Sequence, residues 1–288
     1  MGDARLVVVT GATGRQGGAT ARHLLADGWR VRALSRTPGS VACRRLAEAG
    51  AEVVRADMAD VGSLRSAFRG AYGVFSVQNP MISGVDAEIV QGSSVGAAAA
   101  EAGVRHVVYG SAGTGEPGTG IGQWESKLVV QSCLESLGLP LTVLRPTAFM
   151  ELMTDKDLYP PVAMWHLMPK LMGADRPVPW LCADDLGAVA ARVFREPDRF
   201  VGADLKLASD VRSVAECREL WRDVFGRRPG RFPMPVWMFE RFVGEDLSAM
   251  WRWLRTNPAD GDVATTRSIL PTARTVHEWL LSRQTPPL

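Results

Sequence analysis

Short apolar runs alternate with helical patterns along the first half of the chain. The runs are apolar at consecutive positions, which is typical of strands that are buried on both faces of a sheet. We expect strands at residues 6–10, 30–35, 52–55, 73–77, 104–109 and 141–144. We expect helices between them at residues 17–26, 61–68, 86–102 and 123–137, with one more helix ending at 46–49. Such alternation predicts crossover connections and an α/β fold, a doubly wound parallel sheet with helices on both sides.

The pattern changes after residue 150. Residues 151–180 carry five prolines, and methionines and tryptophans gather in the same segment. Residues 184–195 look helical again and are expected to return to the sheet. We therefore expect one domain at residues 1–150, joined by 181–208, and a smaller, mostly helical C-terminal domain at residues 151–180 and 209–288.

Composition and charge exclude several classes of protein. The 288 residues are 46% hydrophobic and 22% charged, which is ordinary for a globular protein and excludes extensive disorder. Lys and Arg number 33 and Asp and Glu 31, and the net charge of +2 argues against a nucleic-acid partner. No apolar run approaches the roughly 18 residues that a membrane span needs. The first residues lack the apolar stretch of a signal peptide, so we expect a cytoplasmic protein without a membrane partner.

The cysteines and the helical patterns carry little further information. Cys43, Cys133, Cys182 and Cys217 lie far apart and form no CxxC pair. We expect them to be reduced thiols, with neither a disulfide framework nor a metal site. No heptad pattern is present, and we expect a monomer or a homodimer.

A glycine-rich turn follows the first expected strand and opens the first expected helix. Its glycines Gly11, Gly14 and Gly17 have GxxGxxG spacing. Gly11 can adopt the positive φ of a tight turn, Gly14 lets backbone N–H groups approach a pyrophosphate at the helix N-terminus, and Gly17 allows close packing of the helix on the sheet. At the first strand-to-helix junction, this motif predicts a Rossmann-type domain that binds a dinucleotide.

The end of the second expected strand indicates which dinucleotide is bound. Proteins that use NAD usually place Asp or Glu there, to hold the ribose 2′-hydroxyl. This chain has Ser35-Arg36-Thr37, and the guanidinium of Arg36 can bind a 2′-phosphate through two parallel hydrogen bonds. Arg15 could reach the same phosphate, and the alternative is that both are ordinary surface arginines. We expect NADP(H) as the cofactor.

Asp57 and Met58 follow the third expected strand. The Asp57 carboxylate can accept a hydrogen bond from the adenine amino group, or it can cap the next helix. Both residues are included in the expected cofactor site.

One lysine lies on an otherwise apolar helical stripe. Lys127, Val130, Leu134 and Leu137 are spaced i, i+3, i+7 and i+10, which is one face of a helix. A buried ammonium group without partners is costly, and a bound ribose or a substrate oxygen would supply them. The alternative is a lysine whose stem is buried while its charged end reaches solvent from the first turn of the helix.

These residues together resemble the NmrA-like family of atypical short-chain dehydrogenases. The resemblance rests on the glycine turn, Ser35-Arg36, Asp57, the strand Tyr72–Asn79, Lys127, Leu144-Arg145-Pro146 with Phe149-Met150-Glu151, and the closing Leu270-Pro271 and Glu278-Trp279-Leu280. It covers nearly the whole chain, and its motifs are most specific up to about residue 150. It implies a Rossmann domain that binds NADP(H) and a small C-terminal domain that shapes the other wall of the cleft.

The resemblance also implies contacts with the cofactor. The pyrophosphate would be lined by Gly11, Thr13, Gly14, Arg15, Gln16 and Gly17, and the 2′-phosphate by Arg36. The nicotinamide ribose and ring would be surrounded by Val77, Gln78, Lys127 and Phe149. Some family members are reductases of quinones, enones or aromatic natural products, and others are redox-sensing regulators that touch partner proteins.

The chain departs from the wider dehydrogenase superfamily at one position. That superfamily uses Tyr-x-x-x-Lys with the tyrosine as proton donor, whereas Gln123 stands four residues before Lys127. An amide cannot give up a proton near neutral pH, so the donor would be Lys127, a hydroxyl such as Ser111 or Tyr159, His166, or a water molecule. Ser111 ends the fifth strand, where its hydroxyl can face the nicotinamide or cap the adjacent loop. His166 can equally be a surface or core histidine.

Two functions fit these residues. The first is an NADPH-dependent reductase of a small apolar carbonyl, quinone or enone-type substrate, with residues 149–180 as an adaptable apolar lid. Ordinary packing is the alternative for that segment. The second is an NADP(H)-sensing regulator without catalysis that binds a partner protein, which the missing tyrosine favours. We expect the reductase, with Lys127 and Ser111 as its catalytic residues.

Overall fold

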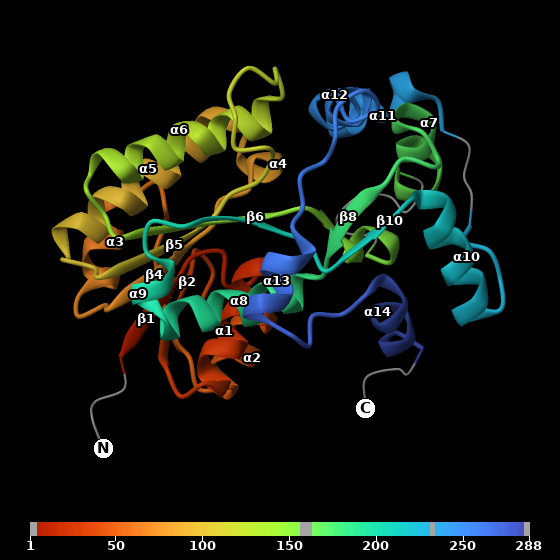
Figure 1. Cartoon of the computed structure of the whole chain (residues 1–288). Coiled ribbons are helices and arrows are strands. Elements are labelled where there is room, and N and C mark those ends of the chain that lie inside the picture. The colour runs from red at the N-terminus through yellow and green to blue at the C-terminus, as the bar shows by residue number, and fades with distance from the viewer. Residues whose placement is uncertain (1–4, 156–162, 231–233, 285–288) are drawn as a thin grey trace. The chain divides into compact units, whose positions relative to one another are not determined.

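The computed structural model describes residues 5–155, 163–230 and 234–284, which form two compact units (Figure 1). The first unit contains the residues up to Gly118, Gly122–Arg145 and Ala183–Leu205. The second unit contains Thr119–Ile121, Pro146–Cys182 and the residues from Lys206 on. The assignment of the C-terminal domain to substrate binding stays a prediction.

The first unit is built on a seven-stranded sheet with the strand order β3-β2-β1-β4-β5-β6-β9. All neighbouring pairs from β3 to β6 are parallel, so the expected strands and their arrangement are confirmed. The edge strand β9 was not predicted. The bounds are β1 Leu6–Val9, β2 Arg30–Ser35, β3 Glu52–Arg55, β4 Gly73–Ser76, β5 His106–Gly110, β6 Leu141–Pro146 and β9 Asp204–Leu207.

The order of the strands places a switch point beside β1. The chain runs from β1 outward to β2 and β3, and then returns to the other side of β1 with β4. Val8 therefore pairs with Arg32 on one side and with Val74 on the other. In sheets of this kind, ligands bind outside the carboxyl ends of the strands at such a point.

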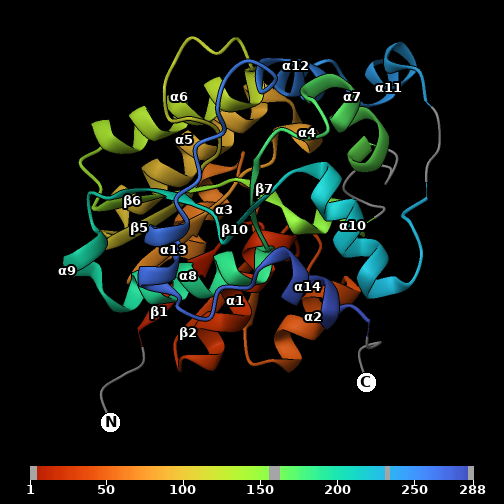
Figure 2. The same ribbon diagram turned by 45° about the vertical axis from the view of Figure 1, so that its right-hand side comes forward.

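Helices cover both faces of this sheet (Figures 1 and 2). On one face α5 packs against α3 and α6, and on the other face α1 packs against α8 and α2. The bounds are α1 Arg15–Ala26, α2 Val41–Glu48, α3 Val61–Phe68, α4 Pro80–Ser83, α5 Val85–Glu101, α6 Gly122–Ser136, α8 Ala183–Arg195 and α9 Pro197–Phe200.

The apolar strands form the core of the first unit. Val8, Val74 and Val107, from three adjacent strands, are completely buried. They share one cluster with Leu64 of α3 and Val95 of α5. This arrangement is why the strands are apolar at consecutive positions: helices cover both sides of the sheet.

The second unit has a small sheet of its own. In it β8, Val178–Leu181, pairs antiparallel with β10, Asp210–Arg212, and parallel with β7, Ala148–Phe149. None of these strands was predicted. The other elements are helical, namely the 3₁₀ turn Met150–Met153, the π-helical turn Ala163–Leu167, α7 Met168–Met172, α10 Val214–Phe225, α11 Val236–Val243, α12 Asp246–Trp253, α13 Val263–Ile269 and α14 Val276–Ser282.

The methionine- and tryptophan-rich segment is part of the core of the second unit. Its sulfur-containing and indole side chains are all buried, and they share one cluster with Phe239 and Trp279. Ordinary packing within the second unit therefore accounts for these side chains, and the expected lid over a substrate stays a prediction. The members from this segment are Met150, Met153, Met164, Trp165, Met168, Met172 and Trp180.

All four cysteines are free thiols. In the part of the chain that is described, no helix combines the length and the apolar character needed to cross a bilayer. The same residues contain no group of three or more His, Cys, Asp or Glu side chains that could hold a metal ion.

Candidate functional site

The glycine turn begins at the carboxyl end of β1, where a hydroxyl joins β1 to β4. Thr10 Oγ1 donates to the carbonyl of Val77 at 3.1 Å and accepts from the Val77 amide at 2.8 Å. Gly11 has φ +57°, and a Cβ there would lie 2.9 Å from Val77 Cγ1. The turn is thus held against the buried end of the β4 segment by contacts that only glycine permits.

The first turn of α1 has no side-chain cap. Gly14 is its N-cap, and neither a capping side chain nor an acidic residue is present in the first turn. A Cβ on Gly17 would lie 2.4 Å from the Gly11 carbonyl oxygen, so a larger residue would push the helix away from the turn. Thr13 is exposed, and Arg15 and Gln16 are half-buried. The positive end of the helix dipole is therefore available to an anion.

The residue after β2 is an exposed arginine. Arg36 makes no hydrogen bond or ion pair with any residue that the structure describes. The loop around it is ordered, because Ser35 Oγ accepts from the Thr37 amide at 3.1 Å and the Ser40 amide donates to the Thr37 carbonyl at 3.1 Å. A free guanidinium on an ordered loop can bind a phosphate group.

The residues after β3 form a tight turn. Asp57 Oδ1 accepts from the Ala59 amide at 3.0 Å, whereas the N-cap of α3 is Asp60, which accepts from Gly62. The alternative that Asp57 caps this helix is therefore wrong. Met58 is half-buried, and its sulfur lies 3.7 Å from Gln78 Nε2, so this turn reaches the end of β4.

Two glutamine oxygens near the ends of β4 and β5 lack partners among the described residues. Gln78 is 3% exposed; its Nε2 donates to Ser76 Oγ at 3.0 Å, but Oε1 accepts from no group. Gln16 Oε1 is likewise buried and unpartnered, and it would lie 3.2 Å from a Cβ built on Gly110. Because buried acceptors are almost always hydrogen-bonded, these oxygens are open to donor groups of a ligand or of water.

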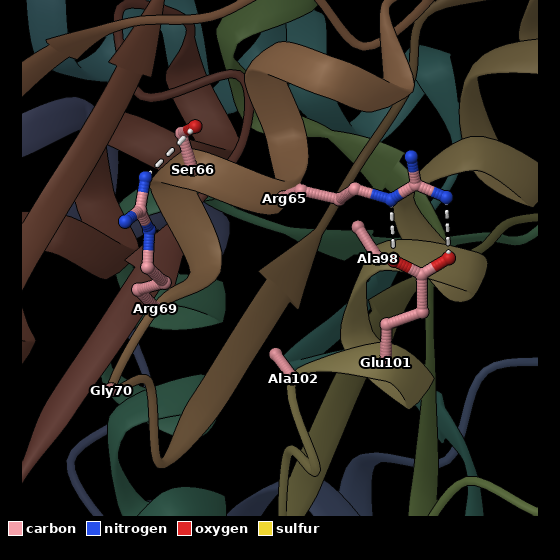
Figure 3. Close-up of a pocket in the computed structure, with 7 residues that line it drawn as sticks. All are labelled: Arg65, Ser66, Arg69, Gly70, Ala98, Glu101 and Ala102. Atoms are coloured by element: carbon pink, nitrogen blue, oxygen red, sulfur yellow. Dashed lines mark hydrogen bonds and ion pairs between the residues drawn. The ribbon is translucent and has the colours of Figure 1, made fainter.

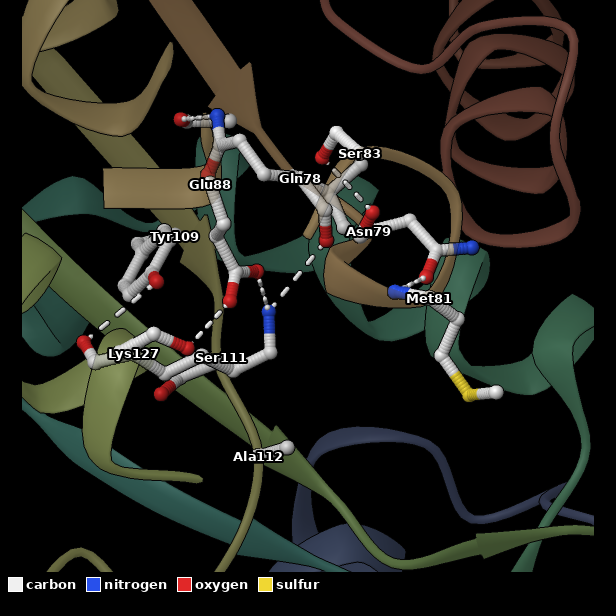
Figure 4. A network of polar contacts seen from close by, with 12 residues as sticks. Gln78, Asn79, Met81, Ser83, Glu88, Tyr109, Ser111, Ala112 and Lys127 are labelled. Atoms are coloured by element: carbon white, nitrogen blue, oxygen red, sulfur yellow. Dashed lines mark hydrogen bonds and ion pairs between the residues drawn. The ribbon is translucent and has the colours of Figure 1, made fainter. Parts of the chain in front are cut away.

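The expected lysine is buried and paired (Figure 4). Lys127 Nζ donates to Glu88 Oε1 at 2.7 Å and to the Gln78 carbonyl at 3.3 Å. Its side chain is 8% exposed, so the alternative of a lysine that reaches solvent is wrong. Val130 and Leu134 of the same stripe are buried, but Leu137 lies beyond the end of α6 and is 40% exposed.

Glu88 is a residue of the site that the sequence reasoning missed. It is completely buried in the first turn of α5, and its second oxygen accepts from Ser126 Oγ at 2.5 Å. The sequence contained a signal that Glu88 is buried. Gly92 and Val95 follow it at i+4 and i+7, so all three lie on the same buried face of α5. A charged residue on an apolar face of a helix requires a partner of opposite charge.

Ser111 lies at the end of β5 and is 1% exposed. Its hydroxyl accepts from Arg145 Nη1 at 3.0 Å and does not cap the adjacent loop. Among the described residues, nothing accepts the proton of this hydroxyl.

Tyr109, two residues earlier, donates to the Lys127 carbonyl at 3.4 Å. Burial, together with the nearby Glu88 carboxylate, raises the pKa of Tyr109 well above the usual value. Tyr109 is thus a protonated core residue.

The remaining candidates lie elsewhere. Gln123 is half-buried one helical turn before Lys127. Phe149, in β7, and the half-buried His166 belong to the second unit. Tyr159 lies outside the described residues. The first unit therefore brings together the glycine turn, Gln78 and Lys127, with Glu88 added.

A separate hollow lies near the amino ends of β4 and β5, at the end of the sheet opposite the glycine turn (Figure 3). It has a volume of about 400 Å³ and is lined at the C-terminal ends of α3 and α5. There Arg65 donates to both oxygens of Glu101, at 2.5 and 2.8 Å. These helix ends lead into the amino ends of β4 and β5, so the hollow is not part of the site at the carboxyl ends.

The chain belongs to the NmrA-like family, whose model matches residues 3–280. The resemblance stated from the sequence is thereby confirmed. One relative is the NmrA-like family domain-containing oxidoreductase FrzB of Cladobotryum sp. It is 29% identical over the aligned region, which covers 90% of this chain and 89% of FrzB.

Solved structures with this fold include a regulator and a reductase. NmrA, a negative transcriptional regulator crystallised with NADP and also with NAD, has a TM-score of 0.78 in the NADP complex at 21% identity, covering 96% of this chain and 94% of its own. Triphenylmethane reductase of Citrobacter sp., complexed with NADP(H), has a TM-score of 0.76 at 20% identity, covering 98% of this chain and 100% of its own. At this identity the likeness establishes the fold, and function must be argued from the site.

Proposed function

We propose that the protein is an NADPH-dependent reductase of a small apolar carbonyl, quinone or enone-type substrate. The observation that carries the proposal is the set of unsatisfied polar groups at the carboxyl ends of β1, β4 and β5. Among the described residues, Gln16 and Gln78 each have a buried oxygen without a partner, and Lys127 uses only two of its three protons. The name of the relative FrzB, an NmrA-like oxidoreductase, supports the broader class of oxidoreductases.

The residues present fit NADP(H). The uncapped N-terminus of α1 suits the pyrophosphate. The glycines of this turn are Gly11, Gly14 and Gly17, and Thr13, Arg15 and Gln16 lie among them. The unpaired Arg36 suits the 2′-phosphate, and no carboxylate stands at Ser35 or Thr37 to repel it. We assign the adenine to the turn at Asp57 and Met58. The nicotinamide end we assign to Val77, Gln78 and Lys127.

Exposed apolar residues beside this edge support an apolar substrate. The short helix α4 follows Gln78 directly and is capped by Asn79, whose Oδ1 accepts from the Met81 amide at 3.0 Å. Met81 is 42% exposed and Ile82 is 76% exposed. A planar or apolar substrate that covers such side chains removes apolar surface from water, which stabilises the complex.

The chemistry divides between the cofactor and the chain. NADPH supplies the hydride when it is bound. Lys127 Nζ, held by Glu88 and the Gln78 carbonyl, has one N–H left for a ribose hydroxyl or a substrate oxygen, and it is the group best placed to supply the proton. Ser111 is the second candidate, because its hydroxyl proton is not used within the described residues. Gln123 supplies no proton.

Turnover of a substrate panel tests this function. NADPH oxidation is followed with quinones, enones and aromatic ketones, and we expect turnover with at least one class. Lys127→Ala should abolish it, whereas Lys206→Ala, which removes an exposed lysine paired with Asp260 at 2.9 Å, should leave it unchanged. Equal activity of the two variants would contradict the role of Lys127.

A second candidate function is an NADP(H)-sensing regulator that binds a partner protein. Gln123 in place of the usual tyrosine favours it. Binding of NADPH without turnover of any compound in the panel would identify this function instead of the reductase.

A further inference from the structure

The partner of Lys127 is a carboxylate that is completely withdrawn from water. Glu88 is 0% exposed, and each of its oxygens accepts one short hydrogen bond, from Lys127 Nζ at 2.7 Å and from Ser126 Oγ at 2.5 Å. A buried ion pair of this kind is costly to form and gives weak evidence for a role in stability. Its position beside Gln78 therefore suggests a role at the site.

The pair is electrically neutral as a whole. Lys127 contributes one positive charge and Glu88 one negative charge, and the other groups that contact them, Ser126 and the Gln78 carbonyl, are uncharged. Tyr109, which is also close to Glu88, stays protonated. Without Glu88, the ammonium would act on its surroundings as an uncompensated charge, and little water would be present to screen it.

The two forms of a nicotinamide cofactor differ in charge at the ring. The oxidised ring carries a positive charge and the reduced ring carries none. An uncompensated ammonium beside the ring would therefore weaken the binding of the oxidised form and leave the reduced form almost unaffected. A compensating carboxylate removes that discrimination.

We propose that Glu88 is a positioning residue that neutralises Lys127, so that the site holds NADP⁺ and NADPH with similar affinity while the ammonium stays hydrogen-bonded beside Gln78. This inference rests on the proposed binding of the nicotinamide end at Gln78 and Lys127. The oxidised ring can then form beside the lysine that the reaction needs without an electrostatic penalty.

The test is the ratio of two dissociation constants, that for NADP⁺ divided by that for NADPH. Both are measured by titration calorimetry on the full chain, and no substrate is required. In Glu88→Gln the ratio should rise on the order of tenfold, because the ammonium is no longer compensated. In Lys127→Met it should fall by a similar factor, because the carboxylate is then alone. Each tenfold change corresponds to about 30 mV in the potential of the bound couple.

A double variant keeps the test valid if Glu88→Gln fails to fold. Glu88→Gln combined with Lys127→Met removes both charges and should return the ratio to about the wild-type value. Comparison of this double variant with Lys127→Met alone isolates the effect of the carboxylate. If the pair had a purely structural role, Glu88→Gln and Lys127→Met would not change this ratio in opposite directions.

The matched control is a glutamate at the other end of the same helix. Glu101 is the last residue of α5, and its exposed pair with Arg65 lies 13 residues from Glu88, roughly 20 Å along the helix. Glu101→Gln should leave the ratio unchanged. A ratio that stays within a factor of two in every variant would overturn the inference. Failure of the wild-type chain to bind either form would instead overturn the proposed function, and the inference with it.

Discussion

Two buried cations in the first unit differ in how fully their hydrogen bonds are used. Arg145 is 1% exposed, and it donates from Nε and Nη2 to both oxygens of Asp204, at 2.7 and 2.8 Å. Its other donors reach Ser111, the Ala112 carbonyl and Gln131. All five N–H groups of a guanidinium are thereby used.

Lys127 is buried to a similar degree but keeps capacity for a further partner. Two of its three protons go to Glu88 and the Gln78 carbonyl, and the side-chain oxygen of Gln78 also has no partner among the described residues. The comparison separates a cation that fastens the end of β6 to the loop after β5 from one that can still bind a ligand. Burial alone would not have distinguished them.

Loss of Arg145 gives the largest expected effect and sharpens this comparison most. Arg145→Ala should lower the free energy of unfolding by about 3 kcal/mol, because it leaves the buried Ser111 hydroxyl and the half-buried Ala112 carbonyl without their donor and the exposed Asp204 without its ion pair. Denaturant unfolding measures the change. Arg145→Lys should recover little, since an ammonium cannot make the paired bonds of a guanidinium.

The corresponding control is Arg65→Ala, which removes the exposed pair with Glu101 and should not measurably change stability. A stable Arg145→Ala protein that has lost NADPH binding would break the comparison, because Arg145 would then act at the site.

The second prediction concerns His106, a buried histidine away from the site, and its effect on stability at low pH. His106, at the amino end of β5, donates from Nε2 to Thr142 Oγ1, which itself donates to the Phe200 carbonyl; Nδ1 is buried without a partner among the described residues. Burial lowers the pKa of His106 from 6.5 to about 4. The unfolded chain therefore takes up this proton first as the pH falls, and His106 should cost roughly 3 kcal/mol of stability between pH 6.5 and 4.

Unfolding measured across this pH range in wild-type protein and in His106→Gln checks that prediction. Glutamine can still donate to Thr142 and does not titrate, so the variant should lose less stability than the wild type on acidification. Parallel stability curves for the two proteins would show that His106 is not held neutral by burial.

The smallest expected effect concerns Arg36, which is exposed and has no partner among the described residues. Arg36→Ala should weaken NADPH binding about tenfold to a hundredfold, the loss of charged hydrogen bonds to the 2′-phosphate, and should leave NADH binding unchanged. Titration calorimetry with each cofactor measures both values. Arg30→Ala, at the exposed amino end of the same strand, is the control. Equal losses for NADPH and NADH would show that Arg36 does not select the phosphate.

Much of the fold follows from local sequence patterns, and the unpredicted strands show where those patterns end. The apolar runs predict β1 to β6 because helices cover both faces of the sheet. β8 contains Pro179, and β10 is only three residues long and begins and ends with charged residues. Their pairing, Asp210 with Trp180, joins segments 30 residues apart and depends on packing in the second unit.

The sequence predicts a candidate site, but the prediction did not include Glu88, which pairs with Lys127. The glycine spacing and Arg36 follow from the turn and strand that carry them, and the helical stripe predicts a buried Lys127. The partner of that lysine comes from another helix, 39 residues earlier in the chain. Only the packing of α5 against α6 brings Glu88 and Lys127 together, although the apolar face of α5 already indicated that this glutamate is buried.

The central claim is that the carboxyl edge of this sheet, with its uncapped helix and partly used lysine, binds NADP(H). A calorimetric titration of NADPH into the wild-type chain tests it most directly. The account predicts a saturable heat of binding with one cofactor per chain. The absence of any binding heat at millimolar NADPH would contradict it.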